Sequence, residues 1–248
     1  MTHQPNQIQI LPTTDFKAGM VLLIDKPYQW TSFNVVSKIR TLLKHHTGDK
    51  KIKVGHAGTL DPLATGLLVI CIGRATKSVN QLTAQDKTYE ATFKLGQTTP
   101  SFDLEKEIDQ TYPTQHINNE LIKKVVANFI GKQQQVPPIF SAKLIDGKRA
   151  YKFARQGLEP EMKPVPIEIF NIDILKFEMP LLKLKIHCSK GTYIRALARD
   201  LGIALNSGAH LVELRRTQSG QFNINQALTI TEFEKIITSM QPIQKTCV

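Results

Sequence analysis

Cysteine is scarce in this sequence of 248 residues, and its placement argues against two kinds of site. Cys71, Cys188 and Cys247 stand far apart and form no Cys-x-x-Cys pair, so a zinc knuckle and a dithiol redox motif are not expected. An odd number of cysteines without a secretory signal is typical of a reducing compartment. We therefore expect a cytoplasmic protein.

Long apolar runs are missing as well. The longest run, Leu67–Ile72, is too short to cross a membrane, and residues 1–11 have neither the basic start nor the apolar stretch of a signal peptide. Apolar residues make up 41% and charged residues 21% of the chain, which is typical of a globular protein and argues against disorder. We expect a soluble protein without a membrane partner.

Acidic residues are outnumbered by basic ones. The chain has 21 Asp and Glu residues against 32 Lys and Arg residues, which gives a formal net charge of +11. Such an excess favours a polyanionic partner, with nucleic acid first and an anionic membrane second. The charge alone is equally compatible with a role in solubility only.

Strand patterns and helix patterns interleave irregularly along the chain. Lys87–Leu95 alternates between apolar and polar residues with the period of a half-buried strand, and apolar residues recur at helical spacing from Thr192 to Leu205. Several predicted strands follow one another directly, so we predict an α+β fold with a mixed, largely antiparallel sheet flanked by helices. Further strands are predicted at 21–25, 67–72, 139–144, 165–177, 182–188 and 210–218, and helices at 32–43, 119–129, 148–156 and 231–239, the last capped by Thr231.

The expected organisation is one main domain with short ends. Residues 1–19 are rich in Gln, Pro and Thr and are expected to form a flexible leader. Residues 20–220 are expected to form the main domain. Residues 221–248 are too few for a second domain of normal size, so we expect a short C-terminal tail.

The segment Val54–Gly66 carries the strongest chemical signal. Its three glycines permit unusual backbone angles, and Pro62 biases Asp61 towards an extended conformation. A carboxylate held on a rigid bend between Leu60 and Leu63 could act as a nucleophile or a general base. The alternative is structural, because Asp-Pro is also a good helix N-cap followed by proline at the first helical position.

His56 in the same segment has several interpretations. It could be a catalytic base, a metal ligand or a wedge into nucleic acid. Metal binding is disfavoured because no second His or Cys stands at ligand spacing on this element. Tyr89, on the apolar side of its predicted strand, is either a core residue or a platform on which a base stacks.

A second segment, Cys188–Gly202, predicts a strand, a glycine turn and a helix N-terminus, which is a natural site for an anion. Arg195 on this helix has no acidic residue three or four positions away. It is therefore either solvated or paired with a distant carboxylate or a phosphate. Other basic residues either contact phosphates or form a solvated surface. These are Lys44, Lys50, Lys51, Lys53, Arg149, Lys152, Arg215 and Arg216.

The segment Gly55–Gly66 closely resembles the signature of the bacterial tRNA pseudouridine-55 synthases of the TruB type. Four further blocks agree with this family in order and spacing, and the resemblance extends over residues 20–220. The blocks are Asp25–Pro27 followed by Thr31–Ser32, Lys87–Tyr89 leading to Leu95–Gly96, Ser189–Arg195, and Ala209–Thr217 ending in Gly220.

The resemblance implies an isomerase with the pseudouridine synthase fold that acts in the T-loop of tRNA, at position 55, without a cofactor or metal. The reaction exchanges the N1–C1′ glycosidic bond of one uridine for a C5–C1′ bond. Because a stacked uridine hides its ribose from side chains, the base must be flipped out. Asp61 is then the catalytic residue, which either attacks the substrate or removes a proton.

The resemblance also assigns the substrate-binding residues. Tyr89 stacks on the target base and Arg195 pairs with the catalytic carboxylate, favouring its charged form. His56 fills the gap that the flipped base leaves, and Leu211 lines the uracil pocket. Contacts to the RNA backbone are expected from Lys51, Lys53, Arg149, Lys152 and Arg215, whereas Lys26 and Pro27 are expected to be structural.

The sequence departs from the family pattern in three places. Gln29 stands where the family commonly has glycine, and residues 98–109 match poorly to the acidic, threonine-rich loop usually found there. A full C-terminal PUA domain is not expected in residues 221–248. The predicted partner is the T-arm of tRNA, no protein partner is implied, and we expect a monomer.

Two other functions fit part of the evidence. An RNA-binding module without turnover explains the charge equally well but gives no reason for the glycine-braced Asp61. A glycosidase or hydrolase with a carboxylate nucleophile usually needs two paired carboxylates, and Asp61 has no acidic neighbour in sequence. Analysis of the RNA product separates all three.

Overall fold

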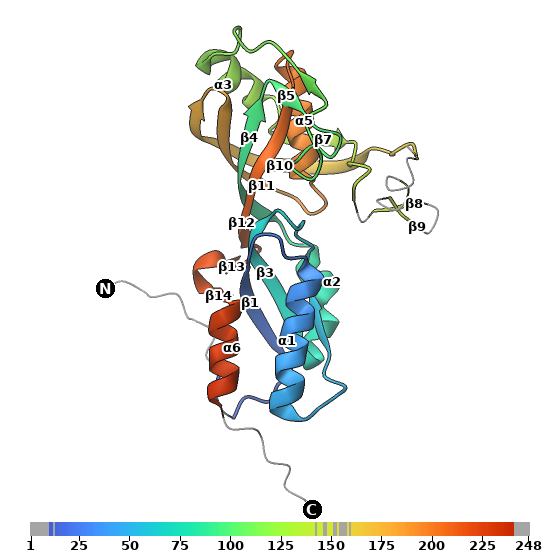
Figure 1. Ribbon diagram of the computed structural model, residues 1–248, viewed down its shortest axis with the longest axis vertical. Helices are drawn as coiled ribbons and strands as arrows, with labels where there is room; N and C mark the ends of the chain where they lie inside the picture. Colours follow the sequence, from blue (N-terminus) through green and yellow to red (C-terminus); the bar gives the residue numbers. More distant parts are fainter. Residues whose placement is uncertain are drawn as a thin grey trace, which may run out of the picture. The chain divides into compact units, whose positions relative to one another are not determined.

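The computed structural model describes residues 10–11, 13–141, 143–145, 148–150, 153, 158 and 160–240. The chain divides into two compact units. Unit 1 consists of residues 1–87 and 215–248, and unit 2 of residues 88–214. The strands form a mixed, mostly antiparallel sheet arrangement flanked by helices (Figure 1), which confirms the predicted fold class.

Unit 1 is built on two long central strands. Strand β1 (Met20–Lys26) pairs antiparallel with β3 (Thr65–Ile72) along its whole length. The other edge of β3 pairs with β2 and, at its first residues, with the end of β12. The remaining strands with residues in this unit are β2 (Val54–His56), β12 (Ala209–Ser219, shared with unit 2), β13 (Phe222–Asn223) and β14 (Leu228–Thr229).

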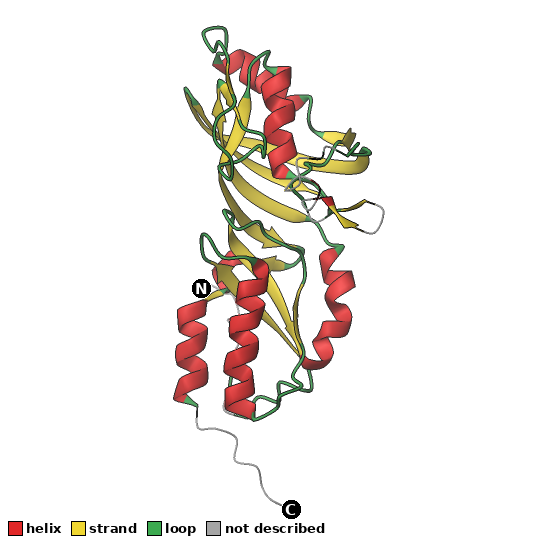
Figure 2. Cartoon of the chain, turned by 45° about the vertical axis from the view of Figure 1, so that its right-hand side comes forward, coloured by secondary structure: helices red, strands yellow, loops and turns green. Residues whose placement is uncertain are grey.

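Helices cover one face of the unit 1 strands (Figure 2). Helix α1 (Ser32–Thr47) and helix α6 (Ile230–Ser239) pack against β1 and β3 in one apolar cluster. The opposite face of the strands packs in a second cluster that includes Leu67 and Val69. The apolar run at 67–72 is therefore buried on both faces. The unit also contains α2 (Val79–Thr83) and the 3₁₀ segments at 73–78 and 224–226.

Unit 2 orders its main strands β12, β4, β11, β10 and β7. Helices α3 and α5 bury apolar residues at helical spacing, among them Val125 and Leu197. The bounds are β4 (Lys87–Leu95), β5 (Gln97–Thr98), β6 (Gln110–Thr111), β7 (Gly131–Gln135), β8 (Leu144–Ile145), β9 (Lys148–Arg149), β10 (Val165–Glu178), β11 (Leu181–Cys188), α3 (Asn119–Ala127) and α5 (Ile194–Ala204).

Four predicted elements need correction. Phe16 is buried in the unit 1 core, so this part of the expected flexible leader is packed. Helix α6 is capped by Thr229 rather than Thr231, because the side chain of Glu232 completes a capping box with Thr229. The strand expected at 139–144 is not found in the described residues 139–141, and only its last residue, Leu144, is extended, in the short strand β8. The helix expected at 148–156 begins instead with strand β9 at Lys148–Arg149, and most of its other residues lie outside the described part of the chain.

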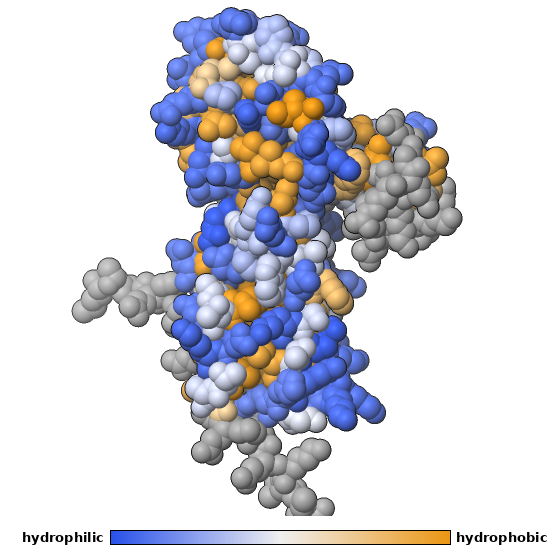
Figure 3. Space-filling view, viewed as in Figure 1, coloured by the Kyte–Doolittle hydropathy of each residue, from blue (hydrophilic) through white to orange (hydrophobic). Residues whose placement is uncertain are grey.

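The surface of each unit is mainly polar. Hydrophilic residues cover most of the face drawn in Figure 3, with smaller apolar areas between them. None of the helices in the described part of the chain is long and apolar enough to span a membrane.

Candidate active site

The segment that carries Asp61 is a loop between β2 and β3. The N–H of Ala64 donates to the carbonyl of Asp61 at 3.1 Å, which closes a turn that leads directly into β3. No helix follows Pro62 in this described segment, so the alternative that Asp61 only caps a helix is wrong. The turn presents Asp61 half-buried at the start of a buried strand.

Glycine is required where this loop meets β12. Gly66 has a φ of +100°, which favours glycine. A Cβ atom at this position would lie 2.3 Å from the carbonyl oxygen of Arg216. The close approach lets β3 pair with the end of β12 and thereby fixes one end of the Asp61 loop.

Both sequence neighbours of Asp61 are anchored by hydrogen bonds. The hydroxyl of Ser32 accepts from the N–H of Leu60 at 2.9 Å and donates to the Leu60 carbonyl at 3.2 Å. The ammonium group of Lys26 donates to the carbonyl of Pro62 at 3.2 Å. The backbone on each side of Asp61 is therefore tied to the start of α1 and to the end of β1.

Lys26 is a buried cation beside this loop. Burial lowers its pKa to about 8, while the negative charges of Asp61 and Asp25 oppose this shift and the positive charge of Arg216 adds to it. Its ammonium also donates to the carbonyls of Pro27 and Trp30, at 3.0 and 2.6 Å. These contacts fit the structural role expected for Lys26.

Arg216 is a second buried cation at the loop, with 1% of its surface exposed. Its guanidinium donates to the carbonyl of Leu67 at 2.7 Å and to that of Gly58 at 3.1 Å. Arg216 was expected either to contact phosphate or to be solvated. Both expectations are wrong, because its side chain is buried. It holds the two ends of the loop together instead.

His56 ends β2 and is half-buried. Burial lowers its pKa, and the nearby positive charge of Arg216 lowers it further. Both effects favour the uncharged imidazole, while a hydrogen bond with the backbone of Gly58 opposes them. An uncharged ring suits the expected role of filling space between bases better than a role as a cation that binds phosphate.

Unit 2 supplies Tyr89 and Arg195. Tyr89 lies on β4 and is buried. Arg195 lies in the first turn of α5 and is 4% exposed, so the solvated alternative is wrong. Its guanidinium donates to the carbonyls of Phe140 and Ser101, at 2.8 and 3.3 Å.

Arg195 also forms an ion pair that the sequence did not single out. Its Nε lies 3.4 Å from a carboxylate oxygen of Asp103, whose side chain is 5% exposed. Asp103 belongs to the 98–109 stretch, where the sequence departs from the family pattern. Nothing in the sequence separates Asp103 from the other acidic residues of that stretch, so only the fold identifies it.

Leu211 lies on β12 and is buried, and its N–H donates to the carbonyl of Phe102 at 2.9 Å. The leucine is therefore next to the loop that carries Asp103. Asp61 and His56 belong to unit 1, whereas Tyr89, Arg195 and Leu211 belong to unit 2. Their assembly into one site stays a prediction.

The residues expected to contact the RNA backbone differ in their surroundings. Lys51 and Lys53 are exposed. Arg215 forms a bidentate ion pair with Asp25, at 3.0 and 2.7 Å, so its charge is already compensated. The side chain of Arg149 and the whole of Lys152 lie outside the described part of the structure.

Among the described residues, no three His, Cys, Asp or Glu side chains gather closely enough to hold a metal ion. That the reaction needs neither metal nor cofactor stays a prediction. The group that this geometry makes available for chemistry is the carboxylate of Asp61, which can act as a nucleophile or as a general base.

Comparison with known proteins identifies the family. Residues 43–194 match the family described as TruB family pseudouridylate synthase (N terminal domain), and residues 195–245 match the tRNA pseudouridylate synthase B C-terminal domain. The second match includes α6 and extends into the expected C-terminal tail, and it begins within the expected main domain. The boundary expected at residue 220 remains a proposal.

Two relatives cover almost the whole chain. The sequence is 55% identical to the tRNA pseudouridine synthase B of Phocaeicola vulgatus over 88% of this chain and 93% of the relative. It is 52% identical to that of Parabacteroides distasonis over 90% of this chain and 95% of the relative.

Among solved structures, the fold is similar to a chain in a crystal structure of a Cbf5-Nop10-Gar1 complex. The TM-score is 0.67 at 28% identity, and the match covers 89% of this chain and about half (54%) of that chain. Sequence and fold therefore agree on one conclusion: the chain belongs to the TruB family of pseudouridylate synthases.

Proposed function

We propose that this protein converts one uridine in the T-loop of tRNA, at position 55, to pseudouridine, with Asp61 as the catalytic residue. The observation that carries the proposal is the braced turn of Asp61, whose two sequence neighbours are held by Ser32 and Lys26. A catalytic group that is already held in position lowers the activation barrier, because the entropy of orienting it is not lost during the reaction.

The reaction breaks the N1–C1′ bond and forms a C5–C1′ bond, while C5 loses a proton and N1 gains one. The carboxylate of Asp61 either attacks the substrate or removes a proton, and the geometry is compatible with both roles. The base must leave its stack before either step. His56, at the end of β2 directly before the Asp61 loop, suits the role of filling the vacated space.

The proposed roles in unit 2 follow the same logic. Tyr89 stacks on the target base, and Leu211 lines the uracil pocket. Arg195 pairs with the catalytic carboxylate in this proposal, and its hydrogen bonds to the carbonyls of Ser101 and Phe140 hold the guanidinium in one orientation. Protein partners are not part of the proposal, which describes a cytoplasmic monomer acting on the T-arm.

The decisive experiment replaces the catalytic carboxylate. Asp61→Asn removes the negative charge while keeping the side-chain shape, so we expect pseudouridine formation in a T-arm stem-loop RNA to fall below detection. The product is mapped by mass spectrometry of the RNA, and loss of tritium from C5-labelled uridine follows the same reaction. Asp173→Asn, at an exposed position on β10, is the control and should be fully active. Full activity of Asp61→Asn would show that the catalytic assignment is wrong.

The same product analysis separates the other functions. An RNA-binding module leaves the uridine unchanged, and a glycosidase releases free uracil. Either result with the wild-type protein would contradict the proposal.

A further inference from the structure

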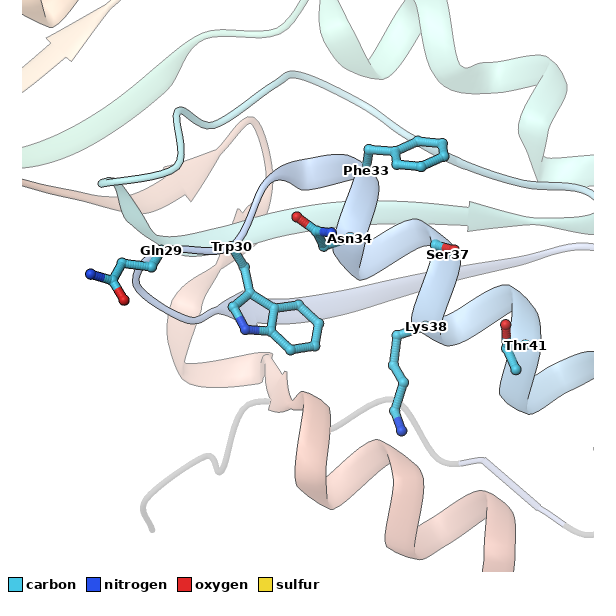
Figure 4. A pocket seen from close by; sticks show the side chains of 7 residues that line it. All are labelled: Gln29, Trp30, Phe33, Asn34, Ser37, Lys38 and Thr41. Carbon is cyan, nitrogen blue, oxygen red and sulfur yellow. The ribbon is translucent and has the colours of Figure 1, made fainter. Parts of the chain in front are cut away.

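Unit 1 contains a pocket of about 410 Å³ at the start of α1, here called the α1 pocket. Its volume is within the range of sites that bind small organic groups. The pocket lies on the part of α1 that faces away from the core, because the buried residues of α1 include Val35, Ile39 and Leu43. The lining residues, drawn in Figure 4, are Gln29, Trp30, Phe33, Asn34, Ser37, Lys38 and Thr41.

Aromatic rings contribute to this pocket. Trp30 is half-buried and packs against the core cluster of unit 1, and in Figure 4 its indole lies on the same side of α1 as Lys38. Phe33 projects from the other side of the start of α1 and is 67% exposed. Flat aromatic surfaces of this kind stack on unpaired bases, with little dependence on which base is present.

Gln29 supplies the second observation. Its φ is +64°, a left-handed conformation that glycine adopts without strain and glutamine does not. Strain at an exposed residue points to a role for its side chain, because glycine would relieve it. Gln29 is one of the residues that line the α1 pocket, and in Figure 4 its amide extends outward from the loop before α1, at the open side of the pocket. Its amide can both donate and accept hydrogen bonds, as the edges of bases require.

Hydrogen bonds connect the α1 pocket to the Asp61 loop. Lys26 donates to the carbonyl of Trp30 and to that of Pro62, at 2.6 and 3.2 Å. Ser32, in the first turn of α1, holds Leu60. The pocket and the loop are therefore held together within unit 1.

The charges at the pocket favour a base over a phosphate. Lys38 forms an ion pair with Glu234 at 2.6 Å, so its positive charge is compensated. The amide oxygen of Asn34 accepts from the N–H and from the hydroxyl of Thr31, so the NH₂ group is the part of this amide that can donate to a ligand. Stacking surfaces and amides remain as the groups that can bind.

We propose that the α1 pocket binds an unstacked base of the same RNA whose uridine is modified. The base stacks on Trp30, and the amides of Gln29 and Asn34 bind its edge. The inference rests on the proposed function for the identity of the RNA. It assigns to unit 1 a second contact with a base, separate from the target uridine.

Trp30 is the one tryptophan of the chain, so its fluorescence reports directly on this pocket. We expect a T-arm stem-loop RNA to quench the emission of the full-length protein, with the same dissociation constant that anisotropy of labelled RNA gives. A blunt duplex with the same stem has no unstacked base and should bind without quenching. Free nucleoside monophosphates at the same concentration should not quench, because they lack the other contacts of the RNA.

The outcomes distinguish the pocket from the proposed function. RNA that binds and is converted to pseudouridine without any change in Trp30 emission overturns the α1 pocket and leaves the proposed function intact. Quenching of equal size by the blunt duplex also overturns it. If the T-arm does not bind at all, the pocket and the proposed function fail together.

Gln29→Gly separates a role in RNA binding from a structural role, because the substitution should change stability and affinity in opposite directions. Relief of the left-handed strain should raise the melting temperature, while the loss of the amide should weaken RNA binding by roughly five- to tenfold. Gln29→Asn, which tolerates the same conformation and keeps an amide, should recover part of the affinity. An affinity of Gln29→Gly equal to that of the wild type would contradict the proposal.

Phe33→Ala provides an independent variant with a matched control. Removing this ring should weaken RNA binding by about fivefold or more. Ile203, on α5 in unit 2, is exposed to nearly the same extent, at 65%, and Ile203→Ala should bind RNA as the wild type does. If both substitutions weaken RNA binding equally, the loss in Phe33→Ala comes from removing any exposed apolar side chain. That result would overturn the assignment of Phe33 to the pocket.

Discussion

The ion pair of Arg195 with Asp103 is buried, whereas many ion pairs of this protein are exposed. Asp103 also accepts the backbone N–H of Glu105 at 2.9 Å. Removing one partner of a buried pair leaves an uncompensated charge, which typically costs about 3–5 kcal/mol. We therefore expect Asp103→Ala to lower the free energy of unfolding by several kcal/mol, as measured by urea denaturation.

The control for this prediction is the partly exposed pair of Glu90 with Lys183 in the same unit, at 3.1 Å. Exposed pairs contribute about 0–1 kcal/mol, so Glu90→Ala should change stability little. Losses of equal size in the two variants would contradict the argument from burial.

Lys26 makes the stability of the protein depend on pH in a predictable direction. Its pKa is about 8 in the folded chain and 10.5 when unfolded, so between these values the unfolded chain holds more protons. The wild type should therefore gain stability relative to Lys26→Met as the pH rises from 8 to 10.5, by an amount on the order of 3 kcal/mol. Denaturation of both proteins across this range measures the difference, and a difference independent of pH would show that Lys26 does not titrate in this way.

The limits of sequence analysis at this scale are physical. The bend at Asp61 could be predicted because Pro62 restricts the backbone of Asp61 and the glycines around it permit tight turns. Asp103 could not, because its importance comes from Arg195, which lies 92 positions later in sequence (195 − 103) and meets it only in the folded unit. The contact of Lys26 with Pro62 could not be predicted either, because these two residues are also far apart in sequence and meet only in the folded chain.

At the scale of elements, the pairing of β3 with β12 depends on Gly66. Gly66→Ala would place a Cβ atom 2.3 Å from a backbone oxygen, which cannot move without separating the strands. We expect a loss of stability well above the roughly 1 kcal/mol that a positive φ alone costs a non-glycine residue. Thermal unfolding checks this.

Gly131→Ala is the matched control. Its φ of +109° is close to that of Gly66, but nothing lies within 4 Å of the added atom. The difference between the two variants isolates the contact with Arg216 from the backbone strain. Equal melting temperatures would show that this contact does not matter.

Elements with a clear period were predicted well, and the others were not. β4 has the predicted bounds because its alternation is strict, although it is buried on both faces and not half-buried as predicted. α5 buries the apolar residues that recur at helical spacing. β7, with the sequence Gly-Lys-Gln-Gln-Gln, has no apolar alternation and exists because β10 offers it hydrogen bonds from Val165 to Ile169. Such a strand is a product of tertiary pairing, which local patterns do not contain.

At the scale of the whole molecule, the net charge of +11 predicts how RNA binding responds to salt. Each phosphate contact releases counterions, so the dissociation constant should rise steeply between low and physiological salt. Titrations of the T-arm RNA at several salt concentrations measure the slope. A constant affinity would remove phosphate contacts as the main source of binding.

The division of the chain has a consequence for its synthesis. Unit 2 is continuous in sequence, whereas unit 1 joins residues 1–87 to residues 215–248. On the ribosome, β1 and β3 emerge early, but their partners β14 and α6 are translated last. Unit 1, which carries Asp61, therefore stays incomplete until the end of translation, and any nascent chain released before residue 216 lacks the arginine that holds the Asp61 loop at Gly58 and Leu67.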